Sequence, residues 1–340
     1  MSVGSGFNVN YLRSLSRVFA SFTIPSGKCP SLSFPIQRMP PIRLRPTILL
    51  LYCFMLLHHI TCSASQHVCA SPHRTARPQL WSHLHPSTLA ETKLSVFPVG
   101  SIENHGPHLP FGTDLLLAEA ITRNAVQGID GVSVLPATPF GASFEHANLP
   151  GTIPIQDDTL NAFWGDVIAG LVASGSKKII IVNAHGGQTQ NVEITIRHAR
   201  FRHNSLVVSF NAQRMLALAW RRVETQKEKY HDEMPYGIHG GFVETAVMMH
   251  LFPDLVKTSE TKNFRRRREF TGALQPHGDI VSFGWRSEDI STSGALGDAA
   301  NASADIGGKI FDETVRELRA LVSEVVDTDP SDVLLFSGTH

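Results

Sequence analysis

Lys178-Ile179-Ile180-Ile181-Val182-Asn183 is the stretch that decides the fold of this 340-residue chain. It is apolar on both faces and rich in β-branched residues, which is typical of a strand buried inside a parallel sheet. Working outward, we expect further strands at 94–99, 132–136 and 206–210, and helices at 114–127, 158–173, 192–201, 241–251 and 304–326. This alternation predicts a single α/β domain around a mostly parallel sheet.

The first ninety residues differ in composition from the rest. Residues 1–90 contain no Asp or Glu, and all four cysteines lie among them. Residues 1–46 are rich in Ser, Pro and Arg, as in an organelle transit peptide or an unstructured leader. The apolar run 47–57 is shorter than the about 20 residues of a membrane span but matches a signal-peptide core. We expect 1–90 to be a targeting leader and disordered linker, for the secretory route or an organelle. If translation starts further in, the protein is cytoplasmic.

The remaining chain is expected to form one domain at 91–328, followed by a C-terminal tail at 329–340. Residues 91–340 carry all 30 acidic residues of the chain against 22 basic ones. A surface this acidic does not favour nucleic-acid binding, and no membrane span is expected here. Because this part lacks cysteine, metal or acid–base chemistry would have to come from His, Asp and Glu.

A first polar cluster follows the expected strand 94–99. Glu103 and His105 are two residues apart, so in an extended chain their side chains point the same way. Asp114 comes after a Gly- and Pro-rich turn that can fold the chain back toward them. Two carboxylates and an imidazole would suit Zn²⁺, Mn²⁺ or Fe²⁺. The alternative is a polar loop in which Asp114 caps the next helix.

Two more clusters lie where other elements begin or end. His185 follows the central strand and precedes two glycines, so it belongs to the carboxyl-end edge of the sheet or to a simple Gly-rich turn. His239 precedes an expected helix, and Glu244 lies about one turn inside that helix, so the two can face one site. Alternatively, Glu244 is an acid favoured by the helix dipole.

Five blocks spread over residues 94–325 resemble the signature of the creatininase (creatinine amidohydrolase) family. They are 98–110, 140–153, 183–187, 239–245 and 297–307. The resemblance implies a three-layer α/β/α fold, two divalent metal ions (Zn²⁺, Mn²⁺ or Fe²⁺), and hydrolysis of an amide-type C–N bond in a small-molecule substrate. It also implies a homo-oligomer, with a hexamer as the family's form.

Carried over by position, the resemblance gives each candidate residue a role. Glu103, His105, Asp114 and His185 match metal ligands, with Asp114 bridging the two ions. His239 matches the family's catalytic histidine. Glu244 matches an acid close to the centre, and so it is a candidate both for catalysis and as a fifth metal ligand.

One departure concerns the substrate. Creatininase proper has a metal-binding Glu where this chain has Gly187, so we expect a missing ligand, open volume beside the metal and poor turnover of creatinine. Related activities include deformylation of formamidopyrimidine nucleotides and removal of residues from a modified peptide. The sequence leaves open a non-catalytic metal- or ligand-binding protein of the same fold, and an inert structural subunit. Specificity loops are expected around 140–146, 230–238 and 283–285.

Overall fold

The computed structural model describes residues 79–223, 237–267, 270, 274–276, 281 and 283–335. All of them belong to one compact unit, Pro72–His340. The expected leader lies outside the described residues as far as position 78, as does most of the expected specificity loop at 230–238.

Five parallel strands form the central sheet, in the order β1-β3-β2-β4-β5. Their bounds are Gln79–Leu80 (β1), Leu94–Val99 (β2), Val132–Val134 (β3), Lys178–Asn183 (β4) and Leu206–Asn211 (β5). Strand β4 pairs with β2 on one side and with β5 on the other, so the run that is apolar on both faces lies inside the sheet as predicted.

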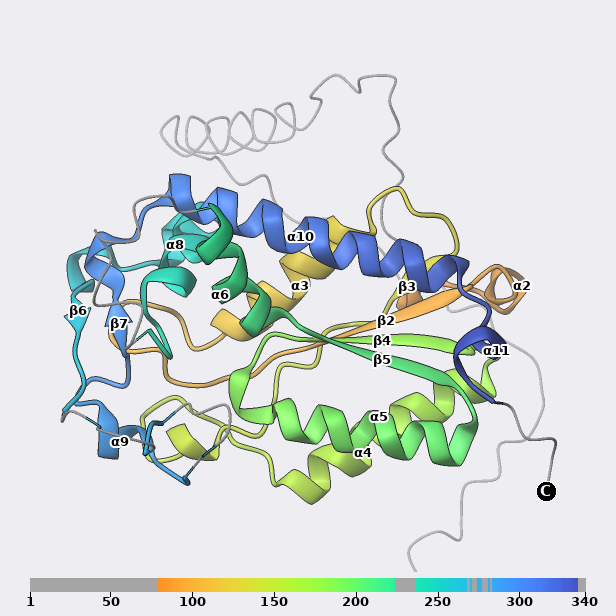
Figure 1. Ribbon diagram of the computed structural model, residues 1–340, viewed down its shortest axis with the longest axis horizontal. Helices are drawn as coiled ribbons and strands as arrows, with labels where there is room; N and C mark the ends of the chain where they lie inside the picture. Colours follow the sequence, from red (N-terminus) through yellow and green to blue (C-terminus); the bar gives the residue numbers. More distant parts are fainter. Residues whose placement is uncertain are drawn as a thin grey trace, which may run out of the picture. The chain divides into compact units, whose positions relative to one another are not determined.

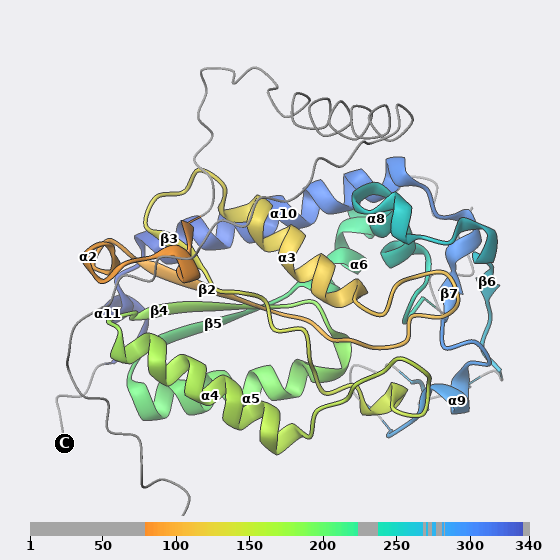
Figure 2. The ribbon, with the colours of Figure 1, turned by 180° about the vertical axis from the view of Figure 1, so that it is seen from behind.

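Helices cover both faces of this sheet. One layer contains α3 (Thr113–Val126), α6 (Ala212–Val223), α8 (Phe242–Leu251) and α10 (Ala304–Asp327); the other contains α4 (Asp157–Ala173) and α5 (Thr189–His203). Figure 2 shows the same two layers from behind. The expected three-layer α/β/α architecture is therefore confirmed.

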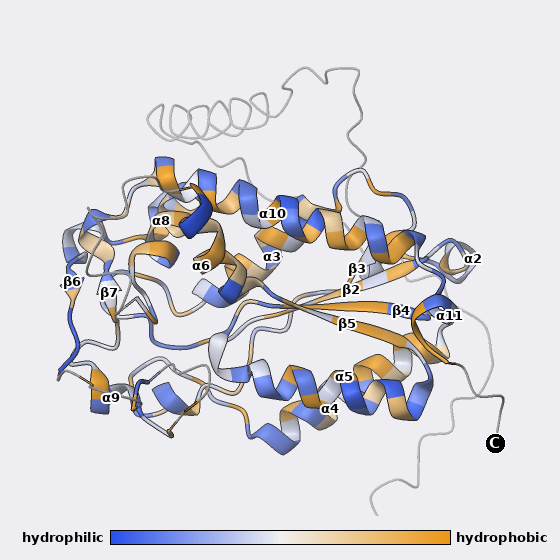
Figure 3. Ribbon diagram, in the orientation of Figure 1, coloured by the Kyte–Doolittle hydropathy of each residue, from blue (hydrophilic) through white to orange (hydrophobic). Residues whose placement is uncertain are grey.

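The alternating side chains of β4 explain the layers. Ile180 and Val182 pack into the apolar cluster that includes residues of α3, α6, α8 and α10. Ile179 and Ile181 pack into a second cluster with residues of α4 and α5, among them the fully buried Trp164. Successive residues of a strand face opposite sides, so a strand apolar throughout needs a helical layer on each side. Figure 3 shows β4 and β5 as apolar ribbons between helices of mixed polarity.

Smaller elements gather beyond the carboxyl ends of the strands. Strands β6 (Asn263–Phe264) and β7 (Gly297–Asp298) form an antiparallel pair, and α9 (Ser287–Ile290) lies at the same end of the fold (Figure 1). Short helical turns complete the chain at Trp81–His83 (η2), Pro86–Leu89 (α2), Phe144–His146 (η3), Gly186–Gln188 (η4), Pro253–Leu255 (η6), Thr258–Glu260 (η7), Ala299–Asn301 (η8) and Pro330–Val333 (α11).

Two features of the fold were not expected. Residues 79–90, assigned above to the linker, are part of the folded unit: Gln79 and Leu80 pair with β3 as the edge strand, and Leu80 packs against the core. Helix α6 follows β5 without an intervening turn residue, so no turn signal separates the two elements along the chain. Within the described part of the chain, no helix combines the length and apolar character that a membrane crossing requires.

Candidate active site

The loops after β2 and β4 leave the sheet side by side. Val99 lies opposite Asn183 in the parallel ladder, and the Ala184 N–H donates to the Val99 carbonyl at 3.1 Å. Ligands in open α/β sheets bind at this carboxyl-end edge. The polar residues that follow the two strands therefore start from neighbouring points.

The loop after β2 folds back on itself, as its turn residues suggested. The Glu103 N–H donates to the Phe111 carbonyl at 3.0 Å. At Gly100, a side chain would collide with the first turn of α3, since an added Cβ would lie 2.6 Å from the Leu115 nitrogen. This close approach carries Asp114 to the start of the loop. The residue before α3 is Gly112, without a side-chain cap, so Asp114 faces the site rather than capping its helix.

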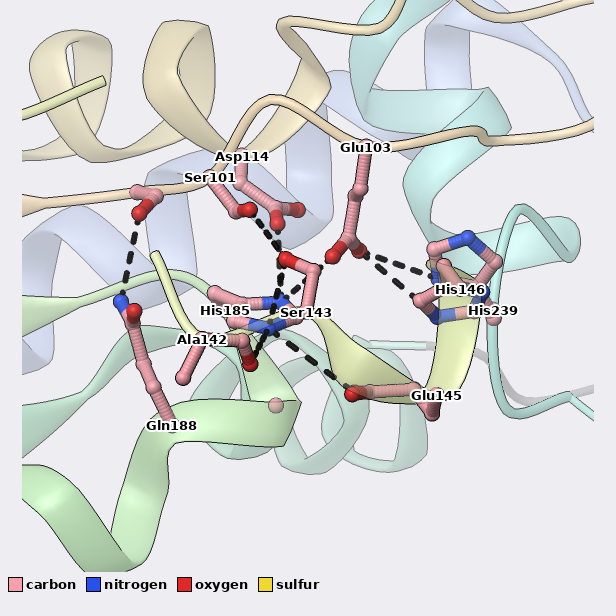
Figure 4. A network of polar contacts seen from close by, with 12 residues as sticks. Ser101, Glu103, Asp114, Ala142, Ser143, Glu145, His146, His185, Gln188 and His239 are labelled. Carbon is pink, nitrogen blue, oxygen red and sulfur yellow. Dashed lines mark hydrogen bonds and ion pairs between the residues drawn. The ribbon is translucent and has the colours of Figure 1, made fainter. Parts of the chain in front are cut away.

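Asp114 lies between two imidazoles. Its Oδ1 is 3.2 Å from His105 Nε2, and its Oδ2 is 3.1 Å from His185 Nδ1. His185 Nδ1 is also 3.2 Å from Glu103 Oε2 (Figure 4). All four side chains are buried. The structure thus brings together the four residues that the sequence proposed as metal ligands.

Glu244 reaches the same centre from α8. Its Oε1 is 3.8 Å from His105 Nε2 and accepts a hydrogen bond from Gln213 Nε2 at 2.8 Å. Its Oε2 accepts the Gly240 N–H at 2.5 Å, just before the helix begins. The two interpretations of Glu244 are therefore compatible, because one carboxylate oxygen supports the start of the helix and the other faces the site.

His239 is fixed by its backbone and by one ring nitrogen. It exchanges backbone hydrogen bonds with Leu296, next to β7. Its Nε2 lies 2.6 Å from the Asn104 carbonyl and donates to it, which leaves Nδ1 as an acceptor 3.6 Å from Glu103 Oε1. The imidazole that the sequence matched to the catalytic histidine thus presents a free nitrogen to the cluster.

Backbone carbonyls orient the other two imidazoles. His105 Nδ1 lies 3.2 Å from the Glu103 carbonyl, and His185 Nε2 lies 3.1 Å from the Ala142 carbonyl. A ring nitrogen that donates to a carbonyl leaves the opposite nitrogen free to accept a metal. In both residues that opposite nitrogen faces Asp114.

Burial and charge act in opposite directions on the pKa values of His105, His185 and Glu103. Burial lowers the pKa of His105, but Asp114 and other carboxylates outweigh it and raise that pKa to about 10. Burial also lowers the pKa of His185, yet Glu103 and Asp114 raise it well above its usual value. Burial would raise the pKa of Glu103, but the neighbouring histidines hold it well below its usual range. For His239, burial and the charge on His105 both lower the pKa, which favours the neutral imidazole.

Three groups among the described residues could each hold a metal ion. They are Glu103–His105–His239, Glu103–Asp114–His185 and His105–Asp114–Glu244, and the potential ligand atoms of each group lie within 4.8 Å of one another. Glu103 Oε2, His105 Nε2 and Asp114 Oδ2 are buried without a hydrogen bond of acceptable geometry, although ionic partners lie nearby. Such atoms are costly unless a further group satisfies them. A divalent cation fits this donor set.

Two neighbouring side chains were missed as site residues. His146 Nε2 lies 3.9 Å from Glu103 Oε1, its ring stacks on His239 at 4.0 Å, and its Nδ1 contacts the Ser287 hydroxyl at 2.5 Å. Glu145 Oε1 lies 3.8 Å from His185 Nε2. Both belong to η3, inside a block that the family resemblance covered and inside the loop 140–146 that was expected to determine specificity. Neither was singled out, because a Glu-His pair in a polar loop carries no signal of its own.

The volume expected beside Gly187 is not open. A Cβ placed on Gly187 would lie 1.9 Å from Glu145 Oε1. The Glu145 carboxylate therefore fills the space that we expected a missing side chain to leave. The expectation failed because it considered position 187 without the loop that packs against it.

The fold and the site together define an α/β protein with a buried carboxylate–histidine centre at the strand ends. The sequence model of the family described as "Creatininase: Creatinine amidohydrolase" matches residues 80–322. The chain belongs to the creatininase family.

Curated relatives of the chain are hydrolases. The mycofactocin precursor peptide peptidase of Mycolicibacterium smegmatis is 29% identical over 64% of this chain and 79% of its own length. The 3-dehydro-scyllo-inosose hydrolase of Thermotoga maritima is 32% identical over 49% of this chain and 53% of its own. The creatinine amidohydrolase of Pseudomonas putida is 24% identical over 52% and 71%. The family thus includes several different hydrolytic activities.

Solved structures share the fold. A putative creatinine amidohydrolase from Bacteroides fragilis superposes with a TM-score of 0.62 at 23% identity, covering 74% of this chain and 98% of that one. A manganese creatininase superposes with a TM-score of 0.59 at 22% identity, covering 74% and 100%. The similarity supports the three-layer architecture described above.

Proposed function

We propose that this protein is a hydrolase that uses two divalent metal ions to cleave an amide-type C–N bond. The observation that carries the proposal is the sharing of Asp114 between two of the three ligand groups. One carboxylate oxygen faces His185 and the other faces His105, so a single side chain can serve two adjacent ions.

The two positions have different ligand sets. Glu103, Asp114 and His185 would hold one ion; His105, Asp114 and Glu244 would hold the other. Nitrogen and oxygen ligands of this kind suit Zn²⁺, Mn²⁺ or Fe²⁺, and three protein ligands leave a coordination position for water or substrate. A manganese creatininase and one described as Zn-Zn type share the fold and support this choice.

The chemistry then divides between the ions and the protein. Bound divalent ions would lower the pKa of a water toward neutrality and polarise the substrate carbonyl. His239 is held by the Asn104 carbonyl so that Nδ1 faces the cluster, and its lowered pKa keeps that nitrogen free to take a proton. The same nitrogen can pass the proton to the departing amine. Burial of the carboxylates excludes bulk water and strengthens their interactions with charge.

The named activities of two of these relatives favour an amide bond. A peptidase and an amidohydrolase both act on C–N bonds, and both are similar to this chain over more than half of it. We therefore propose a cyclic amide or a formamide as the substrate class, rather than creatinine in particular.

A metal-loaded hydrolysis screen tests the proposal. The protein is loaded with Zn²⁺ or Mn²⁺, its metal content is measured, and creatinine, formamidopyrimidines and small formamides are assayed. We expect two ions per chain and hydrolysis of at least one amide. Glu244→Gln should lower hydrolysis about a hundredfold in an enzyme but largely preserve ligand affinity in a binding protein. Full metal content without turnover of any amide would favour the non-catalytic alternative.

A further inference from the structure

Glu145 and position 187 compete for the same space. A Cβ on Gly187 would lie 1.9 Å from Glu145 Oε1 and 2.7 Å from His185 Nε2. Contacts below about 3 Å between non-bonded heavy atoms of this kind are repulsive. Only glycine at 187 therefore lets the Glu145 side chain lie where it does.

Glu145 is the most exposed carboxylate of the site. Its side chain is 19% exposed, compared with 1% for Glu103, 2% for Asp114 and 5% for Glu244. The backbone of Gly187 beside it is exposed as well. The Glu145 carboxylate is therefore the one of these four carboxylates that solvent reaches most.

Glu145 also lies outside the ligand groups. His185 directs Nδ1 toward Asp114 and Glu103, whereas its Nε2 faces Glu145 at 3.8 Å (Figure 4). That Nε2 already donates to the Ala142 carbonyl at 3.1 Å, a shorter contact than the one to Glu145. The Glu145 carboxylate thus keeps acceptor capacity that neither the proposed metal positions nor His185 uses.

We propose that Glu145 is a specificity-determining residue that accepts a hydrogen bond from an ammonium, N–H or O–H group of the substrate beside the scissile bond. The inference rests on the proposed function, because it places a substrate at the metal cluster. An ionised carboxylate only accepts hydrogen bonds, so a bound substrate without a donor would bury it unpaired. A substrate with an anionic group at this point would be repelled. The substrate class is thus an amide with a neutral or cationic donor arm.

A matched series of small probes tests this. N-(2-aminoethyl)formamide, N-(2-hydroxyethyl)formamide and N-propylformamide differ only in whether the arm ends in an ammonium, a hydroxyl or a methyl group. Binding of each to the Zn²⁺-loaded full-length protein is measured by calorimetry, and formate release is followed in parallel. We expect the ammonium arm to bind about tenfold more tightly than the methyl arm, because a charge-assisted hydrogen bond is lost in the latter.

Substitutions at both positions sharpen the test. In Glu145→Gln, which keeps the volume, the affinity ratio between ammonium and methyl arms should fall from about ten to about one or two. Gly187→Ala should displace the carboxylate and lower the ratio similarly. Adding Glu145→Ala to Gly187→Ala should not restore the ratio, because the carboxylate is then absent. Glu193→Gln, on the solvent face of α5, is the matched control and should keep the wild-type ratio.

The outcomes separate this inference from the proposed function. A wild-type protein that shows no preference for the donor arms, including one that binds none of the probes, overturns the role of Glu145. A Glu145→Gln protein with an unchanged ratio overturns it too. If the wild type binds with the expected preference but releases no formate, the role of Glu145 stands and hydrolysis of formamides fails.

Discussion

The two proposed metal positions share Asp114 but are built differently. In the strand half (Glu103, Asp114, His185), Glu103 and His185 follow the paired strands β2 and β4, and Asp114 lies in the first turn of α3. Its His185 Nδ1 lies 3.1–3.2 Å from both carboxylates. In the helix half (His105, Asp114, Glu244), the imidazole is 3.2 Å from Asp114 but 3.8 Å from Glu244, which comes from α8.

The supports of the two halves differ as well. His185 is clamped by Asn183, whose side chain accepts its N–H at 3.1 Å and donates to its carbonyl at 2.8 Å. Glu244 depends on Gln213, a residue of another helix. Ligands on strand ends are set by the sheet, whereas the helix half needs two helices to dock correctly. We therefore expect the strand half to hold its ion more tightly.

Removing the shared ligand should erase the difference between the halves. In Asp114→Asn, both positions lose a charged ligand, so we expect metal content to fall below one ion per chain and kcat/KM to fall at least about a thousandfold. Elemental analysis and kinetics on the same preparation check this. Asp158→Asn, on an exposed turn of α4, should match the wild type. Two ions retained in Asp114→Asn would argue against a bridging role.

Removing one ligand from each half should separate them. In Glu244→Gln, we expect one ion to remain, with kcat/KM about a hundredfold lower. In His185→Ala, the tighter position is damaged, so the residual ion should be bound more weakly than in Glu244→Gln. Chelator titrations of the two variants measure the order of affinities. If the residual ion were instead bound more weakly in Glu244→Gln, the helix half would be the tighter of the two positions.

A smaller effect is expected from changing a residue that supports a ligand of the helix half but does not itself bind metal. Gln213→Ala removes the 2.8 Å hydrogen bond to Glu244 but no ligand. Loss of such an outer support costs about tenfold in metal affinity. We expect that loss for the second ion alone, as seen in competition with a metal indicator. Gln190→Ala, at an exposed position of α5, is the matched control.

The mildest test uses pH on the metal-free protein. The pKa of His105 is raised to about 10 in the folded state, so its stabilising contribution is complete below the unfolded pKa of about 6.5 and is lost as the pH rises through about 10. We expect the Tm of the metal-free protein to fall between pH 7 and 10. The metal-loaded protein should resist this fall, because the ion replaces the proton. Parallel Tm profiles for the two forms would contradict this.

Strands β2 and β4 could be predicted because their sequences suit only one environment, the interior of a sheet covered on both faces. The runs at 94–99 and 178–183 are the observed β2 and β4, since continuous apolar stretches have no stable place except between two layers. The edge strand β1 could not be found in the same way. It consists of Gln79 and Leu80 alone, and only the neighbouring β3 makes it a strand.

The site residues likewise fall into two groups, those that the predicted strands place and those that depend on loop packing. Glu103, His105 and His185 follow predicted strands, so their convergence followed from sheet topology. Glu145 depends on how the 140–146 loop packs against Gly187, a contact across 42 residues that no local pattern encodes. His146 was missed for the same reason, because its role is visible only in its stacking on His239.

The burial of the metal-ligand side chains affects how fast a bound ion is released, rather than how tightly it is held. Glu103, His105 and Asp114 are at most 1% exposed. An ion held by them could leave only when part of the surrounding structure opens, so its release would follow the rate of that local opening. A chelator in excess would then strip the protein at a rate independent of its own concentration. The ions would survive a purification that their equilibrium affinity alone would not.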